Sequence, residues 1–416
     1  MDVRLVKQCV KYFVFVFTFF FTGHAAASYI EAAIGNAVVN DATSVYYNPS
    51  GLAFLANPQL IASWGETFNY SRFSGTTNQV LTSYRQTGSA LSRQEYPFPS
   101  IYFATPVTDR VTVGVSGLYT FLGKEDNGTS SLLRYIGTSS AASLYDISPS
   151  FSVKLLDSLF VGAGADFSFA YISLDQMSGF PTAGIPDSLS QSSGYGRGTS
   201  GHIGAMWHPI LGTILGIVYH SPASVTLDGH STFSGPSSNP DTAVVYTNAF
   251  NVHIVAPPSV VVSLNQYVNP RWSFMGTVER MQWGTIRNLV LKNVAFKSGN
   301  TPVILPQVVQ PFFLHNTWRF SLGTNYAITD KWAVRGAYSY DQDPGNPAWQ
   351  VVSGNNIILS VGTTIKMSKQ CKFDFSYGYT MYQERNINVT QRANQVFGTT
   401  SGGRNTVQGK IIVDFV

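Results

Sequence analysis

The sequence predicts an all-β fold: a transmembrane antiparallel β-barrel of fourteen strands with an N-terminal hatch, or plug, in its lumen. Three observations lead to this prediction. Long and short connections alternate along the chain, the segments between them alternate apolar with polar residues, and charged residues make up only 12% of the chain while aromatic residues make up 14%. Soluble globular chains carry about 25% charged residues. Low charge with many Tyr and Phe is typical of a surface that faces lipid and ends in aromatic girdles.

Residues 1–27 predict a signal peptide. Arg4, Lys7 and Lys11 precede an apolar run of about a dozen residues, and three alanines at 25–27 supply a small-residue cleavage site, so the mature chain is expected to begin at Ser28. The apolar run is too short to span a membrane as a helix. Together with the barrel pattern, the signal places the protein in the bacterial outer membrane.

Residues 28–58 do not follow the strand pattern and predict the hatch. This segment is rich in Ala and Asn, and it contains Asn48-Pro49-Ser50-Gly51, a turn signal. Some thirty residues are too many for a simple lead-in to the first strand. We therefore expect them to fold into the barrel from the periplasmic side, and the barrel itself to occupy 59–416.

The connections give the number of strands. We expect short turns near 105–110, 155–158, 208–212, 267–271, 327–331 and 366–371. We expect long, polar connections near 68–96, 123–142, 173–197, 228–252, 284–315, 342–355 and 383–405. Thirteen connections join fourteen strands, and long loops on one side with short turns on the other are typical of outer-membrane barrels.

The period of two is clear in several strands. In 110–122, Val113 and Val115 share a face opposite Thr112 and Ser116, and the same alternation continues in 158–172, 318–326 and 373–381. The apolar face is expected to contact lipid and the polar face to line the lumen. A soluble β-sandwich would also alternate, but it rarely needs strands this long and aromatic.

Some apolar residues break the alternation. The strand that begins near 211 is apolar on both faces, at Ile214, Leu215, Ile217 and Val218. Apolar side chains that point inward indicate a passage for apolar solutes. The stretch 289–291 (Leu-Val-Leu) in an expected loop is also predicted to line a groove, since exposed apolar patches are uncommon.

Several motifs resemble one family. The stretches 33–37 (Ala-Ile-Gly-Asn-Ala) and 41–52 (Asp-Ala-Thr-Ser-Val-Tyr-Tyr-Asn-Pro-Ser-Gly-Leu) resemble the N-terminal hatch of the FadL/TodX family, outer-membrane transporters of long-chain fatty acids and aromatic hydrocarbons. The family usually has Ala where this chain has Ser50. Further stretches that look like the family are 219–229, 318–326 and 335–341.

This resemblance implies a transport mechanism with no energy source of its own. Ligand would be captured near the extracellular loops and passed by the hatch to a site in the lumen. It would then leave sideways into the bilayer through a kink in the third strand, here 109–122, where Gly114 and Gly117 could form the kink. The alternative is that these glycines only make room for inward neighbours. Asn48, Pro49 and Gly51 would hold the hatch conformation beside the ligand, or form a plain turn.

A fatty acid needs cationic partners for its carboxylate. The candidates on faces assigned to the lumen are Arg319, Arg335 and Lys366. The alternative is that these cations neutralise inward carboxylates, for which the candidates are Asp166, Asp341 and Asp374.

The sequence predicts no enzyme and no cofactor. The His residues outside the signal peptide are scattered, and neither a G-x-S-x-G elbow nor a metal-ligand spacing is present. Cys371 is the sole cysteine of the mature chain, so no intramolecular disulfide is expected. No basic run resembles a nucleic-acid patch.

The expected partners are a long-chain fatty acid or another hydrophobic small molecule, outer-membrane lipid and lipopolysaccharide, and the barrel assembly machinery, with the protein itself a monomer. A general diffusion porin and a barrel phospholipase are the alternative functions.

Overall fold

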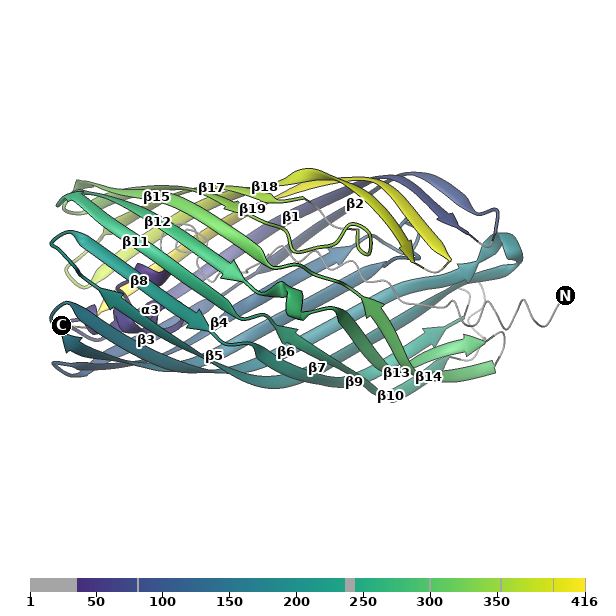
Figure 1. The fold of residues 1–416 in the computed structure, drawn as a ribbon, viewed down its shortest axis with the longest axis horizontal. Coiled ribbons are helices and arrows are strands. Elements are labelled where there is room, and N and C mark those ends of the chain that lie inside the picture. The colour runs from purple at the N-terminus through teal and green to yellow at the C-terminus, as the bar shows by residue number, and fades with distance from the viewer. Residues whose placement is uncertain are drawn as a thin grey trace.

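The computed structural model describes residues 36–80, 82–235, 244–298, 301–351, 354–391 and 393–415. The predicted signal peptide and the first residues of the hatch, 28–35, lie outside these ranges. The strands form one antiparallel sheet that closes on itself and encloses short helices near the end where the C-terminus lies (Figure 1). No helix in the described ranges is both long and apolar enough to cross a membrane.

Strand segments make up most of the described chain. The first ten are β1 (Gln59–Gln79), β2 (Arg85–Pro97), β3 (Ser100–Thr108), β4 (Val111–Asp126), β5 (Ser139–Leu156), β6 (Leu159–Phe180), β7 (Ile185–Trp207), β8 (Thr213–His220), β9 (Ala223–Ser234) and β10 (Val245–Ala256). The others are β11 (Ser259–Asn269), β12 (Trp272–Met281), β13 (Asn288–Ser298), β14 (Thr301–Pro311), β15 (Thr317–Thr329), β16 (Trp332–Asp341), β17 (Asn356–Lys366), β18 (Cys371–Gln391) and β19 (Asn394–Asp414).

These nineteen described segments form the fourteen strands of the barrel wall. Each of these full crossings of the wall is called a stave below. Five staves consist of two segments each with a short interruption between them: β2 with β3, β8 with β9, β10 with β11, β12 with β13, and β14 with β15. The first and last strands close the ring, with β1 and β19 paired from Gln59↔Asp414 to Gln79↔Asn394. The predicted fourteen-strand barrel is confirmed.

The alternation of side chains divides lipid face from lumen. On β4, Val113 and Val115 are 37% and 42% exposed, whereas Thr112 and Ser116 are 3% and 2% exposed. The exposed positions are apolar because they meet lipid, and the small hydroxyl residues face the interior. The predicted faces of this strand are confirmed.

The predicted short turns are confirmed, but the predicted long connections are wrong in extent. The range 68–96 is mostly the hairpin of β1 and β2, joined by 80–84, and 173–197 is mostly β6 and β7, joined by the 3₁₀ turn η3 (Pro181–Ala183). These strands continue beyond the apolar belt, where Ser, Thr and Asn replace the outward apolar residues. Pairing continues there because backbone hydrogen bonds do not require an apolar face, and polar composition was therefore a poor signal for a loop.

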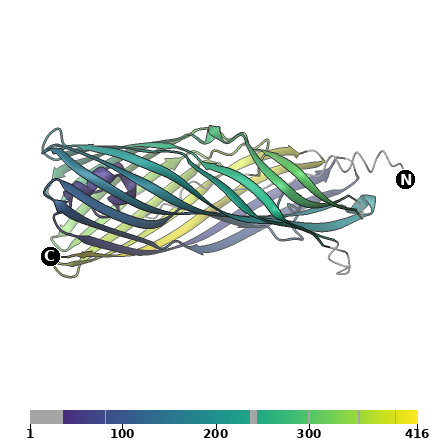
Figure 2. The ribbon, with the colours of Figure 1, turned by 90° about the horizontal axis from the view of Figure 1, so that it is seen from below.

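The hatch lies inside the barrel at the end with the short turns (Figures 1 and 2). It comprises η1 (Asn36–Val38), α3 (Ser44–Tyr47) and η2 (Pro49–Phe54). Val45 and Leu52 pack against Tyr102 and Leu118 of the wall in one buried cluster. This packing places the hatch against the inner face of the wall.

The inward apolar residues of β8 contact the hatch. Ile214 packs with Val38, and Val218 packs with Ala37. The apolar character of these side chains therefore does not require a solute passage. These side chains are apolar because they pack against the hatch.

We expect charge on the lipid face of β15 to destabilise the barrel according to depth. Ile328 lies beside the short turn and Leu322 lies six residues farther along the strand, and both are exposed. Leu322→Arg should lower the free energy of unfolding in lipid vesicles by about 2–4 kcal/mol, and Ile328→Arg by about 0–1 kcal/mol. Urea titration measures both values. Equal losses at the two positions would contradict the assignment of this face to lipid.

Candidate functional site

A cavity of about 290 Å³ lies between the hatch and the wall. Asn36, Tyr46 and Tyr47 of the hatch line it, together with residues of the wall from β4 to β13 and Phe312 beyond β14. An apolar cavity of about 150 Å³ can hold benzene. The space here is therefore large enough for a small hydrophobic molecule.

One part of the cavity is apolar. Leu144, Ile172, Trp283 and Leu289 line it and belong to the same buried cluster. The stretch 289–291 was predicted to line a groove. Leu289 does line the cavity, although it lies on β13 and not in a loop.

The other part is polar and acidic. Asp146, Asp166 and Glu279 line it, whereas no Lys or Arg does so in the described part of the chain. Burial, followed by the negative charges of these three carboxylates, raises the pKa of the Tyr46 phenol well above its usual value. Tyr46 therefore keeps its proton at neutral pH. Because Arg319 lies 3.4 Å from Glu279, the like charge that an entering anion would meet comes from Asp146 and Asp166.

Asn48 organises the hatch. Its side chain is fully buried, its Nδ2 donates to the Ala37 carbonyl at 2.7 Å, and its Oδ1 accepts from the Ser50 hydroxyl at 2.7 Å. The same oxygen accepts from the Ser50 N–H and so caps η2, in which Pro49 occupies the first turn. Asn48 and Pro49 thus shape the turn between α3 and η2. Their position beside a ligand stays a prediction.

Glycines of the wall let the hatch approach closely. A Cβ atom at Gly204 would lie 2.0 Å from Asn48 Oδ1, and one at Gly216 would lie 1.8 Å from the Ala37 carbonyl oxygen. Within the hatch, a Cβ atom at Gly51 would lie 2.1 Å from the Val39 carbonyl oxygen. No larger residue fits these positions without displacement of the hatch.

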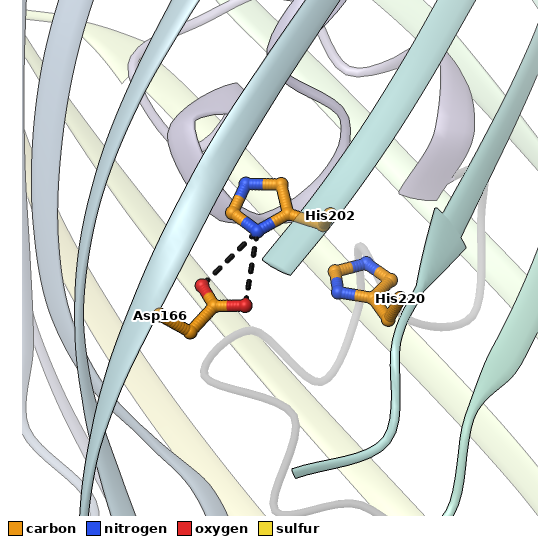
Figure 3. A group of neighbouring side chains, drawn as sticks. All are labelled: Asp166, His202 and His220. Atoms are coloured by element: carbon orange, nitrogen blue, oxygen red, sulfur yellow. Dashed lines mark hydrogen bonds and ion pairs between the residues drawn. The ribbon is translucent and has the colours of Figure 1, made fainter. Parts of the chain in front are cut away.

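Asp166, His202 and His220 form a cluster whose spacing would suit a metal ion (Figure 3). His202 Nδ1 faces Asp166 Oδ1 at 3.0 Å, and its Nε2 donates to the Val45 carbonyl at 2.9 Å. Both ring nitrogens of His202 thus have partners within the protein, Asp166 on one side and the Val45 carbonyl on the other. We therefore assign His202 to anchoring the hatch. Sequence reasoning missed it because the contact joins β7 to a segment more than 150 residues earlier.

Two of the three predicted head-group cations are paired with carboxylates. Arg319 NH2 lies 2.9 Å from Asp341 Oδ2, and its NH1 lies 3.4 Å from Glu279 Oε2. Arg335 pairs with Asp374. Neither arginine lines the cavity, and Lys366 is exposed at the end of β17. The structure places the two arginines in the alternative arrangement weighed from the sequence, and the role of all three cations as head-group partners stays a prediction.

The third stave separates from its neighbour beyond Leu118. β4 pairs with β3 as far as Ser100↔Leu118, while β2 pairs with β1 and not with β4 in the described residues. The register of β4 with β5 shifts between Tyr119 and Phe121. The loss of regular pairing along β4 thus begins just after Gly117. At Gly114 a Cβ atom would lie 2.5 Å from Val45 Cγ2, so this glycine also makes room for the hatch.

Comparisons with known proteins were made for the sequence and for the fold. The family model described as "Outer membrane protein transport protein (OMPP1/FadL/TodX)" matches residues 18–413. A search of curated proteins found no match.

Three solved structures share the fold. The chain is similar to a FadL homologue of Pseudomonas aeruginosa, with 16% identity, a TM-score of 0.81, and coverage of 97% of this chain and 100% of that one. It is similar to the P. putida toluene transporter TodX, with 17% identity, a TM-score of 0.71, and coverage of 92% and 98%. For the monoaromatic hydrocarbon channel CymD the identity is 16%, the TM-score 0.70 and the coverage 93% and 97%.

The close contact between Gly204 and Asn48 allows a test of how the hatch is held in place. Gly204→Ala should displace the hatch and raise the ion conductance of the barrel in a planar bilayer severalfold, because the new methyl group takes the place of Asn48 Oδ1. Gly276→Ala is the matched control, since the nearest atom to its Cβ is Leu322 Cδ2 at 3.8 Å. If both variants conduct like the native protein, the hatch does not depend on this contact.

Proposed function

Because the chain belongs to the OMPP1/FadL/TodX family of outer-membrane transport proteins, we propose that it carries small, neutral hydrophobic molecules across the outer membrane. They bind in the cavity beside the hatch and leave sideways through the barrel wall. The proteins of this family are transporters, so the protein is not an enzyme.

The composition of the cavity carries the proposal. Apolar residues on one side of the cavity can contact an aromatic ring. The other side is lined by carboxylates, and no Lys or Arg lines the cavity in the described residues. Burial of an ionised carboxylate is unfavourable unless a cation pairs with it. A fatty acid would bring its head group beside Asp146 and Asp166. The P. putida protein TodX is described as a toluene transporter. Toluene is small and neutral, which are the properties that this cavity favours.

The hatch and the third stave supply the proposed route. Tyr46 and Tyr47 lie between the cavity and the end of the barrel with the short turns, so a shift of α3 would change the shape of the cavity. Leu118, Thr120 and Phe121 line the cavity where β4 leaves its neighbour. An opening there supports lateral exit near the predicted kink. No energy source is needed when the ligand moves down its own gradient.

The preference for neutral ligands is testable on the purified protein. Toluene should bind at least tenfold more tightly than benzoate, a difference of about 1.4 kcal/mol, as measured by competition with a radiolabelled ligand. Asp146→Asn removes one negative charge and should narrow this ratio severalfold. Asp228→Asn, which changes an exposed carboxylate outside the cavity, should leave it unchanged. Benzoate binding as tight as toluene binding would favour an acid as the substrate.

A general diffusion porin is the alternative that the hatch argues against. Deletion of residues 28–52 removes η1, α3 and part of η2. A hatch transporter should gain nonspecific ion conductance and lose selective uptake of toluene by cells. A porin should change little, because its conductance does not depend on this segment. Heat-dependent mobility in electrophoresis shows whether the shortened barrel assembles.

A further inference from the structure

The wall of the barrel is interrupted on four neighbouring staves. The interruptions lie between β8 and β9, β10 and β11, β12 and β13, and β14 and β15. In the first two the chain passes through Pro222 and through Pro257-Pro258, which have no N–H to donate. The third contains the 3₁₀ turn η4 (Trp283–Thr285). A continuous belt of irregular backbone therefore crosses this side of the wall.

The backbone ladder is open at one place in this belt. β11 pairs with β12 up to Ser259↔Met281, and the Gln282 N–H donates to the Pro258 carbonyl at 3.0 Å. Pairing resumes only at Val252↔Leu291, between β10 and β13. Between these points lie residues 253–257 on one edge and 283–290 on the other, all described and with no strand pairing between them. The edge formed by residues 283–290 is three residues longer than the edge formed by 253–257. The 3₁₀ turn η4 takes up this extra length as a short coil on the wall (Figures 1 and 2).

The cavity reaches this opening. All five consecutive residues from His253 to Pro257 line it. On this edge His253 is exposed at the wall, whereas Ile254 packs against the buried apolar cluster that lines the cavity. The lining therefore includes both an outward and an inward residue of the same edge, which indicates that the cavity reaches between the two edges. On the other edge its lining includes exposed Thr285 and buried Leu289.

The opening lies near the outer rim of the lipid-facing belt. About ten residues of β12 separate it from the short turn, which at about 3.3 Å per residue and a tilt of about 40° gives roughly 25 Å, the height of the apolar band. Outward residues below it, Phe274 and Val278, are exposed and apolar. Unpaired backbone at membrane depth is tolerated where it lines a cavity.

We propose that this opening is a second lateral portal, through which small apolar molecules dissolved in the outer leaflet exchange with the cavity. It rests on the proposed function, because it assumes that the cavity holds such molecules. It is distinct from the opening beside β4, since six staves lie between the two positions in the ring. Ile254 and Ile286 on the two edges line the path with apolar surface.

Photolabelling tests the portal. The native protein in lipid vesicles is exposed to 3-trifluoromethyl-3-phenyldiazirine, an apolar ring that partitions into the bilayer, and labelling of Ile172 is followed by mass spectrometry. Ile172 lies on β6, is 1% exposed and lines the cavity, so lipid does not reach it directly. Deletion of Trp283–Thr285 makes the two edges equal in length and should let them pair. We expect the initial rate of Ile172 labelling to fall at least threefold, with the remainder entering by other routes.

A second variant covers the case in which the deletion prevents assembly. Ala256→Trp fills the opening without a change in chain length and should lower the rate in the same direction. Ala249→Trp, at an exposed position of β10 outside the cavity, is the matched control and should leave the rate unchanged. An assembled Ala256→Trp variant that labels Ile172 at the native rate overturns the portal alone. Absence of Ile172 labelling in the native protein, despite labelling of lipid-facing residues, overturns the proposed function as well.

Discussion

Backbone pairing in lipid is the constraint on which the rest of this structure depends. An unpaired N–H or C=O group in hydrocarbon is so unfavourable that a spanning sheet must close on itself. The continuous ladder between β1 and β19 provides this closure across twenty-one residue pairs. The places where pairing fails are therefore exceptions that need a structural explanation. Both of those described above, beside β4 and between β10 and β13, border the cavity.

The hatch is held by apolar packing against the wall and by hydrogen bonds to it. The Val45 carbonyl accepts from Ser150 and His202, and the Ser50 carbonyl accepts from Ser152. Each bond of this kind contributes about 0.5–1.5 kcal/mol. A plug attached by several such contacts is stable at rest, and a modest local rearrangement can still release part of it.

Charge in the lumen is distributed in a way that separates structure from binding. Arg319 neutralises Glu279 and Asp341, and Arg335 neutralises Asp374, so the cations satisfy buried carboxylates in the wall. Removal of one partner from such a pair leaves an uncompensated buried charge. The cavity itself has an apolar side and a side lined by carboxylates.

Local patterns in the sequence were enough to predict the number of strands, the lipid face and the presence of a hatch. These patterns are a period of two, turn residues at the short connections, and a motif around Asn48-Pro49 that fits no strand. Which inward charges meet, how far the polar strands extend and where the interruptions align were visible only in the folded barrel. Arg319 and Glu279 are forty residues apart, and residues 253–257 face 283–290 only because β11 and β12 pair below them. Such contacts depend on register between strands, and a single sequence does not encode register in any local pattern.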